Sequence, residues 1–289
     1  MQPQQLDEVA AFVARLQADP AHHIGYFGEH EDDIAQYIRE LEPAGTDGFL
    51  LAYEDEKLAG LLGMEADPEI KRAWLHGPMI DHADWNIIAD QLYREACQHV
   101  IPTYVSIHEL FGNIGNHYLR MFAERQGFTP LPDTAAVLRF KRHKLAALPV
   151  TEAPELEPRY YEAFLQLHET TFPNTYYLGK QVIARLNAHN KVFIVADGDA
   201  LQGYIYARID TGGDGYIDFL GVEESARRQG IGRRLITAAT HWLLSFPSVR
   251  QVALTVNGRN AAAIALYKQL GYEHLYTLQA YRKPVSANS

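Results

Sequence analysis

Hydrophobic positions in the C-terminal half of the chain follow two different spacings. In some segments apolar residues recur every three or four positions, as in an amphipathic helix, and in others they alternate with polar residues, as in a strand. Helical spacing covers residues 159–171, 179–189, 231–245 and 260–270. Strand-like runs cover residues 192–196, 202–209, 215–222, 250–256 and 273–282. This order predicts a mixed α/β sheet with helices on its faces.

Turn and cap residues separate these segments. DGD at 197–199 predicts a hairpin, and GGDG at 212–215 predicts a longer turn. Asn260 suits the N-cap of the last helix, because its short polar side chain can accept a hydrogen bond from the first turn. Gly271 suits the position just after the end of the same helix.

The N-terminal half repeats features of the C-terminal half at an offset of about 144 residues. NHYLRMFAERQGF (116–128) matches NAAAIALYKQLGY (260–272), and Asn113 and Asn116 stand as Asn257 and Asn260 do. LAYEDEKLAGLLG (51–63) likewise mirrors VADGDALQGYIYA (195–207). Between the halves, LAALPVTEAPELEP (145–158) is proline-rich, lacks a helical period and indicates a linker. We therefore predict a duplicated domain, with one copy in residues 1–146 and the other in 147–289.

Charge and composition narrow the classes of partner. The chain has a net charge of −10; residues 1–145 hold 23 acidic and 12 basic residues, and residues 146–289 hold 13 and 14. An acidic half argues against nucleic acid, which needs a basic face. No apolar run reaches the roughly 18–20 residues that span a bilayer, so no membrane partner is expected. The oligomeric state stays open.

Cysteine usage and the N-terminal residues point to a cytoplasmic protein. Cys97 is the single cysteine, which excludes an intramolecular disulfide framework and fits a reducing compartment. The start, MQPQQLDEVAAFVARL, has no basic segment followed by an apolar one, so we expect no secretory signal. No HExxH or Cys/His spacing supports a metal site among the 13 histidines.

Positive charge and glycine are concentrated in ARRQGIGRRL (226–235), between a strand-like run and a helical one. The start of a helix offers unpaired backbone N–H groups and the positive end of the helix dipole, which together bind phosphate. Gly230 and Gly232 have no Cβ, so a diphosphate could approach the backbone closely. The arginines at 227, 228, 233 and 234 add charge that would favour such a ligand.

The spacing from Val222 through Arg227 to Gly230 and Gly232, followed by VNGRNAAAIALYKQLGY, resembles the GCN5-related N-acetyltransferase (GNAT) superfamily. The resemblance covers roughly residues 155–285. The dinucleotide fingerprint GxGxxG is absent, and so is the Gly-Lys-Ser/Thr of a P-loop.

The resemblance implies the acyl-CoA N-acyltransferase fold, with splayed strands and with acetyl-CoA as co-substrate. Strand backbone at Leu220, Gly221 and Val222 would then contact the pantetheine arm. Amides from Arg228 to Arg233 would hold the diphosphate, and Asn257 and Asn260 match positions that contact the arm and cap the helix. The cofactor-binding positions implied in this way are Leu220, Gly221, Val222, Arg227, Arg228, Gly230, Ile231, Gly232, Arg233, Asn257 and Asn260.

Acetyl transfer to an amine needs a base and an acid. An alkyl amine has a pKa of about 10.4, so deprotonating it at pH 7 costs about 4–5 kcal/mol. By the same resemblance, Tyr267 matches a tyrosine placed near the sulfur and is the candidate general acid. Asp218 is the candidate base, with a hydrogen-bonded strand carboxylate as the alternative reading. Strand alternation predicts Tyr216, Asp218, Leu220 and Val222 on one face.

The acceptor pocket is expected in HETTFPNTYYLGK (168–180), with Phe172, Tyr176 and Tyr177 lining it and Glu169 as a charge partner. The N-terminal copy lacks the corresponding chemistry. Opposite Arg227, Gly230 and Gly232 it has Ala83, Asn86 and Ile88, and opposite Tyr267 it has Ala123. We therefore expect a tandem GNAT arrangement in which only the C-terminal copy binds acetyl-CoA.

Together these features predict an N-acetyltransferase that transfers an acetyl group from acetyl-CoA to a primary amine by direct attack. The acceptor would be a small cationic or peptidyl amine, and its identity stays open. One alternative is a non-catalytic acyl-CoA-binding sensor or interaction module. Another is an acyltransferase that acts on a hydroxyl or uses a longer acyl chain.

Overall fold

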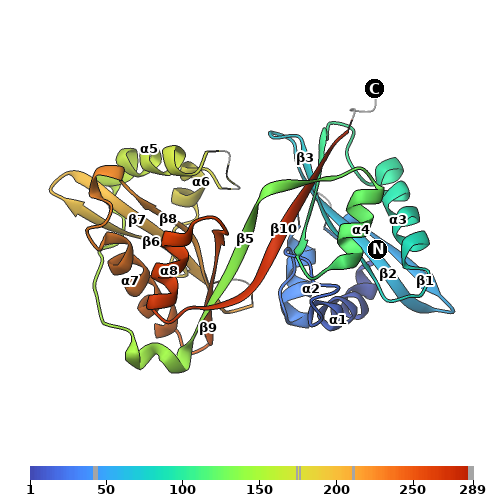
Figure 1. The fold of residues 1–289 in the computed structure, drawn as a ribbon, viewed down its shortest axis with the longest axis horizontal. Helices are drawn as coiled ribbons and strands as arrows, with labels where there is room; N and C mark the ends of the chain where they lie inside the picture. The colour runs from blue at the N-terminus through green and yellow to red at the C-terminus, as the bar shows by residue number, and fades with distance from the viewer. Residues whose placement is uncertain (42–44, 174, 176, 210–211, 286–289) are drawn as a thin grey trace. The chain divides into compact units, whose positions relative to one another are not determined.

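The computed structural model describes residues 1–41, 45–173, 175, 177–209 and 212–285 (Figure 1). The chain forms two compact units. The N-terminal unit comprises Met1–Ala135 together with the C-terminal segment that starts at Tyr276, and the C-terminal unit comprises Ala136–Leu275. Within the described residues, no helix combines the length and the apolar character needed to cross a bilayer.

The same order of helices and strands occurs twice along the chain (Figure 1). The first series is α1 (Leu6–Gln17), α2 (Glu31–Glu40), β1 (Phe49–Glu54), β2 (Lys57–Asp67), β3 (Arg72–Ile80), α3 (Trp85–His99), β4 (Ile107–Asn113), α4 (His117–Arg125) and β5 (Thr129–Lys141). The second is α5 (Tyr161–Thr171), α6 (Gly179–Ala184), β6 (Asn190–Asp197), β7 (Ala200–Ile209), β8 (Gly215–Val222), α7 (Ile231–Ser245), β9 (Gln251–Asn257), α8 (Ala261–Gln269) and β10 (Glu273–Pro284). This order agrees with the duplication predicted from the sequence.

The predicted elements of the C-terminal half are all present, and the largest difference in length is in one helix. The helix predicted over 179–189 ends at Ala184. Asn187 accounts for the early end, because its side-chain oxygen accepts hydrogen bonds from the backbone N–H groups of His189 and Asn190. Such a local side-chain turn competes with helix continuation.

Each unit contains a parallel strand pair that separates after a short contact. In the C-terminal unit β6, β7 and β8 are antiparallel, and β8 pairs with β9 in parallel only from Gly215↔Val252 to Ile217↔Leu254. In the N-terminal unit β1, β2 and β3 are antiparallel, and β3 pairs with β4 only from Arg72↔Ile107 to Trp74↔Glu109. The mixed sheet with splayed strands is thus confirmed.

The last strand of the chain pairs within the N-terminal unit. From Leu278↔Asn113 to Pro284↔Ile107, β10 runs antiparallel to β4, whereas β5 from Ala136 onward belongs to the C-terminal unit. Strands β5 and β10 therefore each contribute residues to both units. The boundary predicted between residues 146 and 147 separates the two similar stretches of sequence. The compact units are divided by their contacts instead, so this boundary stays a prediction.

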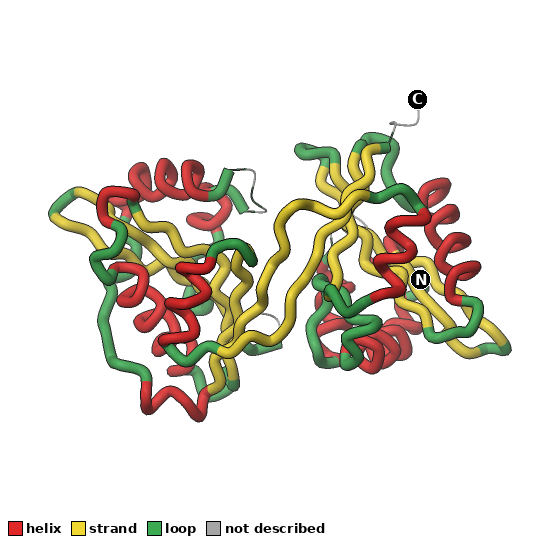
Figure 2. The backbone as a smooth tube through the Cα atoms, viewed as in Figure 1, coloured by secondary structure: helices red, strands yellow, loops and turns green. Residues whose placement is uncertain are grey.

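Helices cover both faces of the sheet in the C-terminal unit, seen in Figure 2 as red coils around yellow strands. On one face, the α7 side, Ile205, Ala207 and Ile217 pack with residues of α7 and α8. On the other, the α5 side, Tyr204, Tyr206 and Phe219 pack with residues of α5 and α6. These two names are used below for the two faces.

The segment predicted as a linker follows the edge of the C-terminal sheet. Residues 145–147 belong to a 3-10 helix, Arg142–Ala147, and the extended residues beyond it meet β6. Ile194 N–H donates to the carbonyl of Pro154, and Leu156 N–H donates to that of Val192. Linker residues thus form hydrogen bonds with backbone groups at the outer edge of β6. A linker that lay in solvent would leave these groups without a protein partner.

Candidate active site

The separation of β8 from β9 leaves part of β8 without a neighbouring strand on that side. Pairing stops at Ile217↔Leu254, so the backbone of Leu220, Gly221 and Val222 has no partner strand there, although it still pairs with β7 on the other side. These are the three residues predicted to contact a pantetheine arm. On that side a thioester ligand could pair with the backbone of β8 as a further strand would.

Gly221 is fixed at this position by close packing on the α5 side. A Cβ added there would lie 2.6 Å from Cε1 of Tyr204, a fully buried ring. The Tyr204 hydroxyl is in turn hydrogen-bonded to Nδ1 of His168, with 2.6 Å between the two atoms. A larger residue at 221 would therefore displace β8 from this ring.

The start of α7 is open and has no side-chain cap. Gly230 is the N-cap residue with φ of +83°, and no heavy atom lies within 4 Å of a Cβ added to it. At Gly232 the nearest contact of an added Cβ would be Leu266 at 3.5 Å. Arg228, in the same loop, has φ of +63°, a left-handed conformation that favours glycine. The loop therefore presents the first backbone N–H groups of α7 without a covering side chain.

The four arginines around this helix start have different partners. Arg227 Nε donates to the carbonyl of Val222, at 3.2 Å, and so closes the loop between β8 and α7. Arg233 Nη2 donates to Gln269 Oε1, and Arg234 Nε donates to the carbonyl of Glu152, both at 2.8 Å. Within the described residues the side chain of Arg228 has no hydrogen-bond or ion-pair partner, and the first turn of α7 contains no acidic residue. The local charge favours an anion.

Asn257 and Asn260 form the turn between β9 and α8. Asn260 is the N-cap, as predicted, and its Oδ1 accepts a hydrogen bond from Ala263 N–H at 3.1 Å. Asn257 Oδ1 accepts from Arg259 N–H at 2.8 Å. The matching turn in the N-terminal unit has the same arrangement, with Asn116 accepting from Leu119 N–H at 2.8 Å.

Tyr267 lies on α8 within the core on the α7 side. It is 5% exposed, and its ring meets that of Tyr272 edge-on with 5.7 Å between centroids. Burial raises the pKa of the Tyr267 hydroxyl above its ordinary value. A phenol in this setting is protonated at neutral pH, the state that a general acid requires.

Asp218 lies at a β-bulge, and here the predicted alternation is wrong. Phe219 pairs with Tyr206 and Ile217 with Ala207, so Asp218 is the extra residue of β8. Leu220 and Val222 pack on the α7 side, whereas Asp218 meets Arg208 on the α5 side. One inserted residue exchanges the faces of every residue beyond it.

The Asp218 carboxylate is buried in an ion pair. Arg208 Nε donates to Asp218 Oδ2 at 2.8 Å, and the two side chains are 28% and 1% exposed, respectively. Burial alone would lower the pKa of Arg208, but the Asp218 carboxylate beside it raises this pKa above its ordinary value. Sequence reasoning missed Arg208, although a single charge within the apolar run GYIYARI was a visible signal.

The α5 side also holds the aromatic residues expected near an acceptor. Phe172 packs on Phe219 with 5.0 Å between ring centroids, and His168 packs on the same ring at 4.8 Å. His168 is buried, and its Nε2 is hydrogen-bonded to the carbonyl of Tyr177 at 2.8 Å. Tyr176, the third predicted aromatic, lies outside the described residues. The segment after α5 is thus held by His168, another residue that the sequence did not single out.

The corresponding helix start in the N-terminal unit is closed. Asp84 is the N-cap of α3 and places an acidic side chain where an anion would bind. Trp85 follows and stacks on Tyr118, with 5.3 Å between ring centroids. The Asn86 side chain is hydrogen-bonded to Arg125, whose Nη1 donates to Asn86 Oδ1 at 2.9 Å.

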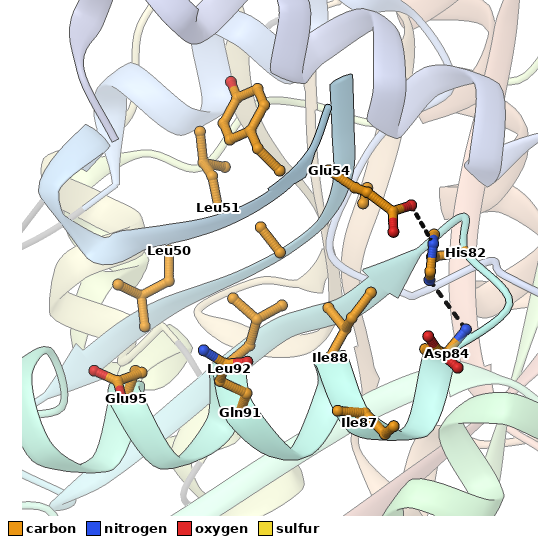
Figure 3. Close-up of a pocket in the computed structure, with 13 residues that line it drawn as sticks. Leu50, Leu51, Glu54, His82, Asp84, Ile87, Ile88, Gln91, Leu92 and Glu95 are labelled. Atoms are coloured by element: carbon orange, nitrogen blue, oxygen red, sulfur yellow. Dashed lines mark hydrogen bonds and ion pairs between the residues drawn. The ribbon is translucent and has the colours of Figure 1, made fainter. Parts of the chain in front are cut away.

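A cavity of about 470 Å³ lies elsewhere in the N-terminal unit, between β1 and α3 (Figure 3). Leu50, Ile88 and Leu92 line its apolar part, and Glu54 is paired with His82 at its rim. His82 Nδ1 accepts a hydrogen bond from Asp84 N–H at 3.0 Å. This cavity lies along the side of α3 and therefore does not correspond to the split between β8 and β9.

Comparison with known proteins shows that the sequence containing this site is similar to one family. Residues 154–272 match the family described as "Acetyltransferase (GNAT) family". An N-alpha-acetyltransferase from Sulfurisphaera tokodaii is 31% identical over 34% of this chain and 66% of its own length. A mycothiol acetyltransferase from Rhodococcus erythropolis is 30% identical over 32% of each chain. The chain thus spans less than two thirds of both curated relatives.

Solved structures extend the likeness to almost the whole chain. A GCN5-related N-acetyltransferase from Sphaerobacter thermophilus has a TM-score of 0.75 at 16% identity, covering 98% of this chain and 94% of that one. A tandem GNAT protein from the clavulanic acid biosynthesis pathway has a TM-score of 0.64 at 15% identity, covering 98% and 96%. Residues 154–272 therefore match the GNAT acetyltransferase family, and the chain as a whole has the fold of solved GNAT structures, a tandem GNAT protein among them.

Proposed function

We propose that the C-terminal unit is an N-acetyltransferase that transfers an acetyl group from acetyl-CoA to the primary amine of a small cationic or peptidyl acceptor. The observation that carries this proposal is the split between β8 and β9, which opens beside the uncapped start of α7. Strand backbone at Leu220–Val222 would receive the pantetheine arm. The amides between Arg228 and Arg233 would receive the diphosphate.

Direct attack by the amine requires a proton acceptor and a proton donor. The amine nitrogen attacks the thioester carbonyl, the C–S bond breaks, and the amine proton leaves through Asp218, directly or by way of water. Tyr267 gives a proton to the departing thiolate. Backbone N–H at Val222 stabilises the oxyanion of the tetrahedral intermediate. The residues proposed as catalytic are thus Asp218 and Tyr267.

Release of free thiol tests this function. Wild-type protein is incubated with acetyl-CoA and a panel of primary amines, and CoA thiol is measured with a chromogenic disulfide. We expect amine-dependent thiol release, with kcat falling by about 10²-fold or more in Tyr267→Phe while the affinity for CoA stays within about twofold. Retained CoA binding without thiol release for any amine would instead indicate an acyl-CoA-binding sensor.

A matched control separates loss of the acid from loss of packing. Tyr272→Phe removes a hydroxyl from the neighbouring buried ring, which is hydrogen-bonded to Thr240 Oγ1 at 2.7 Å. This variant, like Tyr267→Phe, loses one buried tyrosine hydroxyl, but it loses no proposed proton donor. Equal losses of kcat in Tyr267→Phe and Tyr272→Phe would remove Tyr267 from the mechanism.

A further inference from the structure

Arg208 and Asp218 form an ion pair on the α5 side of the site, and the arginine is the more accessible of the two charges. Asp218 has a side chain that is 1% exposed and is held by Arg208 Nε at 2.8 Å. The Arg208 side chain is 28% exposed. An incoming molecule therefore meets the guanidinium before it meets the carboxylate.

Arg208 is oriented by its neighbours but keeps hydrogen-bonding capacity. Its Nε is used by Asp218, and its Cζ lies 5.1 Å from the centroid of the Tyr216 ring. Among the described residues, neither Nη1 nor Nη2 donates a hydrogen bond. A guanidinium fixed in this way presents two parallel N–H groups that match the two oxygens of a carboxylate.

Arg208 is placed beside the split rather than far from it. Tyr216 links it to β9, because the Tyr216 hydroxyl is hydrogen-bonded to Thr255 Oγ1 at 2.6 Å. This contact crosses from β8 to β9 at the last paired positions, next to Ile217↔Leu254. Neighbouring strands lie about 4.8 Å apart, so Arg208 on β7 stands one strand spacing from β8, which forms one wall of the split.

A second arginine, Arg185, adds positive charge on the α5 side. Arg185 Cζ lies 4.2 Å from the centroid of the Tyr177 ring, on the segment that follows α5. Burial, helped by the nearby Asp218 carboxylate, raises the pKa of Tyr206 on this face to about 12, although Arg208 and Arg185 both act to lower it. Both guanidinium groups are therefore within electrostatic reach of one hydroxyl.

We infer that the acceptor carries a carboxylate as well as its primary amine, and that Arg208 binds this carboxylate through Nη1 and Nη2. The inference rests on the proposed acetyltransferase function and narrows its acceptor to amino-acid or acidic peptidyl amines. A polyamine would instead place a second positive charge beside Arg208. The Asp218 carboxylate could balance that charge, but it is already paired with Arg208. Asp218 then has two tasks on this face, since it orients Arg208 and also lies at the bulge beside the split.

Matched pairs of acceptors test the inference. The probes are glycine, β-alanine and 4-aminobutyrate, each compared with its neutral amide, so that charge changes while size does not. We expect kcat/KM for the best acid to exceed that for its amide by about 10- to 100-fold. In Arg208→Met this ratio falls to about 1, and in Arg208→Lys it falls only in part because charge is kept but the planar pair of donors is lost.

The control variant is Arg159→Met in the same unit. Arg159 also has an acidic partner, Glu157, and also stacks on a tyrosine, Tyr160, with Cζ 4.7 Å from the ring centroid. It precedes α5 and takes no part in the site. The ratio of acid to amide is expected to stay unchanged in this variant.

Binding is measured separately, so that turnover is not needed to test carboxylate recognition. Ligand-observed NMR of 4-aminobutyrate and its amide is recorded with the CoA-saturated protein. The double variant Arg208→Met/Asp218→Asn is included because it removes the ion pair as a unit and leaves no buried charge alone. A preference for the acid in wild type that is absent from both variants supports the inference, even if no thiol is released.

Two results would overturn the inference. One is equal binding and equal turnover of acids and amides by the wild type. The other is a preference for acids that survives in Arg208→Met. In both cases thiol would still be released with the amide acceptors. Failure of this inference can therefore be told apart from failure of the proposed function.

Discussion

At the scale of single residues, the surroundings of Asp218 decide which role a carboxylate can have. Asp218 is almost fully buried and accepts a hydrogen bond from Arg208 Nε, so an acceptor reaches the carboxylate only beside this guanidinium. The bulge turns Asp218 to the α5 side, away from Leu220 and Val222. The amine would therefore approach from the side where Arg208 is exposed.

The role of Asp218 is tested by Asp218→Asn, which keeps the shape but cannot take up the proton. If Asp218 is the base, the rate falls at all pH values and most steeply below the pH optimum, where the amine is most fully protonated. We expect a loss of about 10²-fold there. The measurement is kcat/KM against pH for both proteins. A uniformly lowered profile of unchanged shape would leave Asp218 only the task of orienting Arg208.

Buried histidines in the N-terminal unit make a second prediction at this scale. Burial lowers the pKa of His76 to about 3 and the pKa of His108 to about 4. His76 is held neutral, with its Nε2 2.9 Å from the Tyr37 hydroxyl and its Nδ1 3.2 Å from the carbonyl of Trp74. Because the unfolded chain takes up a proton near pH 6.5 and the folded one does not, stability falls as pH drops below 6.5.

The expected loss is about 2 kcal/mol per histidine in the free energy of unfolding between pH 7 and pH 5. Urea unfolding at the two pH values measures it. His76→Gln cannot be protonated in this range, so its loss on going to pH 5 should be smaller than that of the wild type by about 2 kcal/mol. An identical pH dependence in the two proteins would mean that His76 does not carry this linkage.

At the scale of elements, the start of α7 combines several local features that point to an anion. Gly230 has a positive φ and no side chain, Arg228 is also left-handed, and no acidic residue lies in the first turn. In the N-terminal unit, α3 begins instead with Asp84 and a Trp85 ring stacked on Tyr118. The two copies thus share the helix but differ at its first turn.

Arg228→Ala tests the helix start. Loss of a charge-assisted contact to the diphosphate should weaken CoA binding by about 1–3 kcal/mol. Binding of S-acetylpantetheine, which lacks the diphosphate, should not change. Isothermal titration of both ligands makes the comparison, with Arg159→Ala as the matched arginine control. Equal weakening of both ligands would show that Arg228 acts on the protein rather than on the diphosphate.

The helices and strands of the C-terminal half could be predicted from the sequence because each has a clear period and clear ends. Asn260 and Gly271 mark the ends of α8, and the structure has Asn260 as the N-cap and Gly271, with φ of +97°, just after the C-cap. The bulge at Asp218 could not be predicted in the same way. The eight-residue sequence of β8 shows the same pattern whether or not it contains a bulge. Only its pairing with β7 shows that Asp218 is the extra residue.

The partners of strands also lie beyond a local pattern. The run at 273–282 reads as a strand wherever it pairs, so the sequence gives no sign that Leu278–Pro284 lie against β4. Arg208 and Asp218 are ten residues apart, and only the register of β7 with β8 brings them together. The proposed diphosphate-binding residues could be predicted because they follow one another along a single loop and helix start, from Arg227 to Arg233.

At the scale of the whole molecule, the chain holds two copies of one fold with different chemistry. Both copies keep a parallel strand pair that separates after three residue pairs. The N-terminal copy has Asp84 in the anion position and Ala123, which is buried, opposite Tyr267. We therefore expect one molecule of acetyl-CoA per chain.

The most direct test is a crystal structure of the full chain with acetyl-CoA. We predict one ligand per chain, with its diphosphate at the amides near Gly230 and Gly232 and its thioester in the opening between β8 and β9. An empty crevice at that place, or a ligand bound instead at the start of α3, would contradict it.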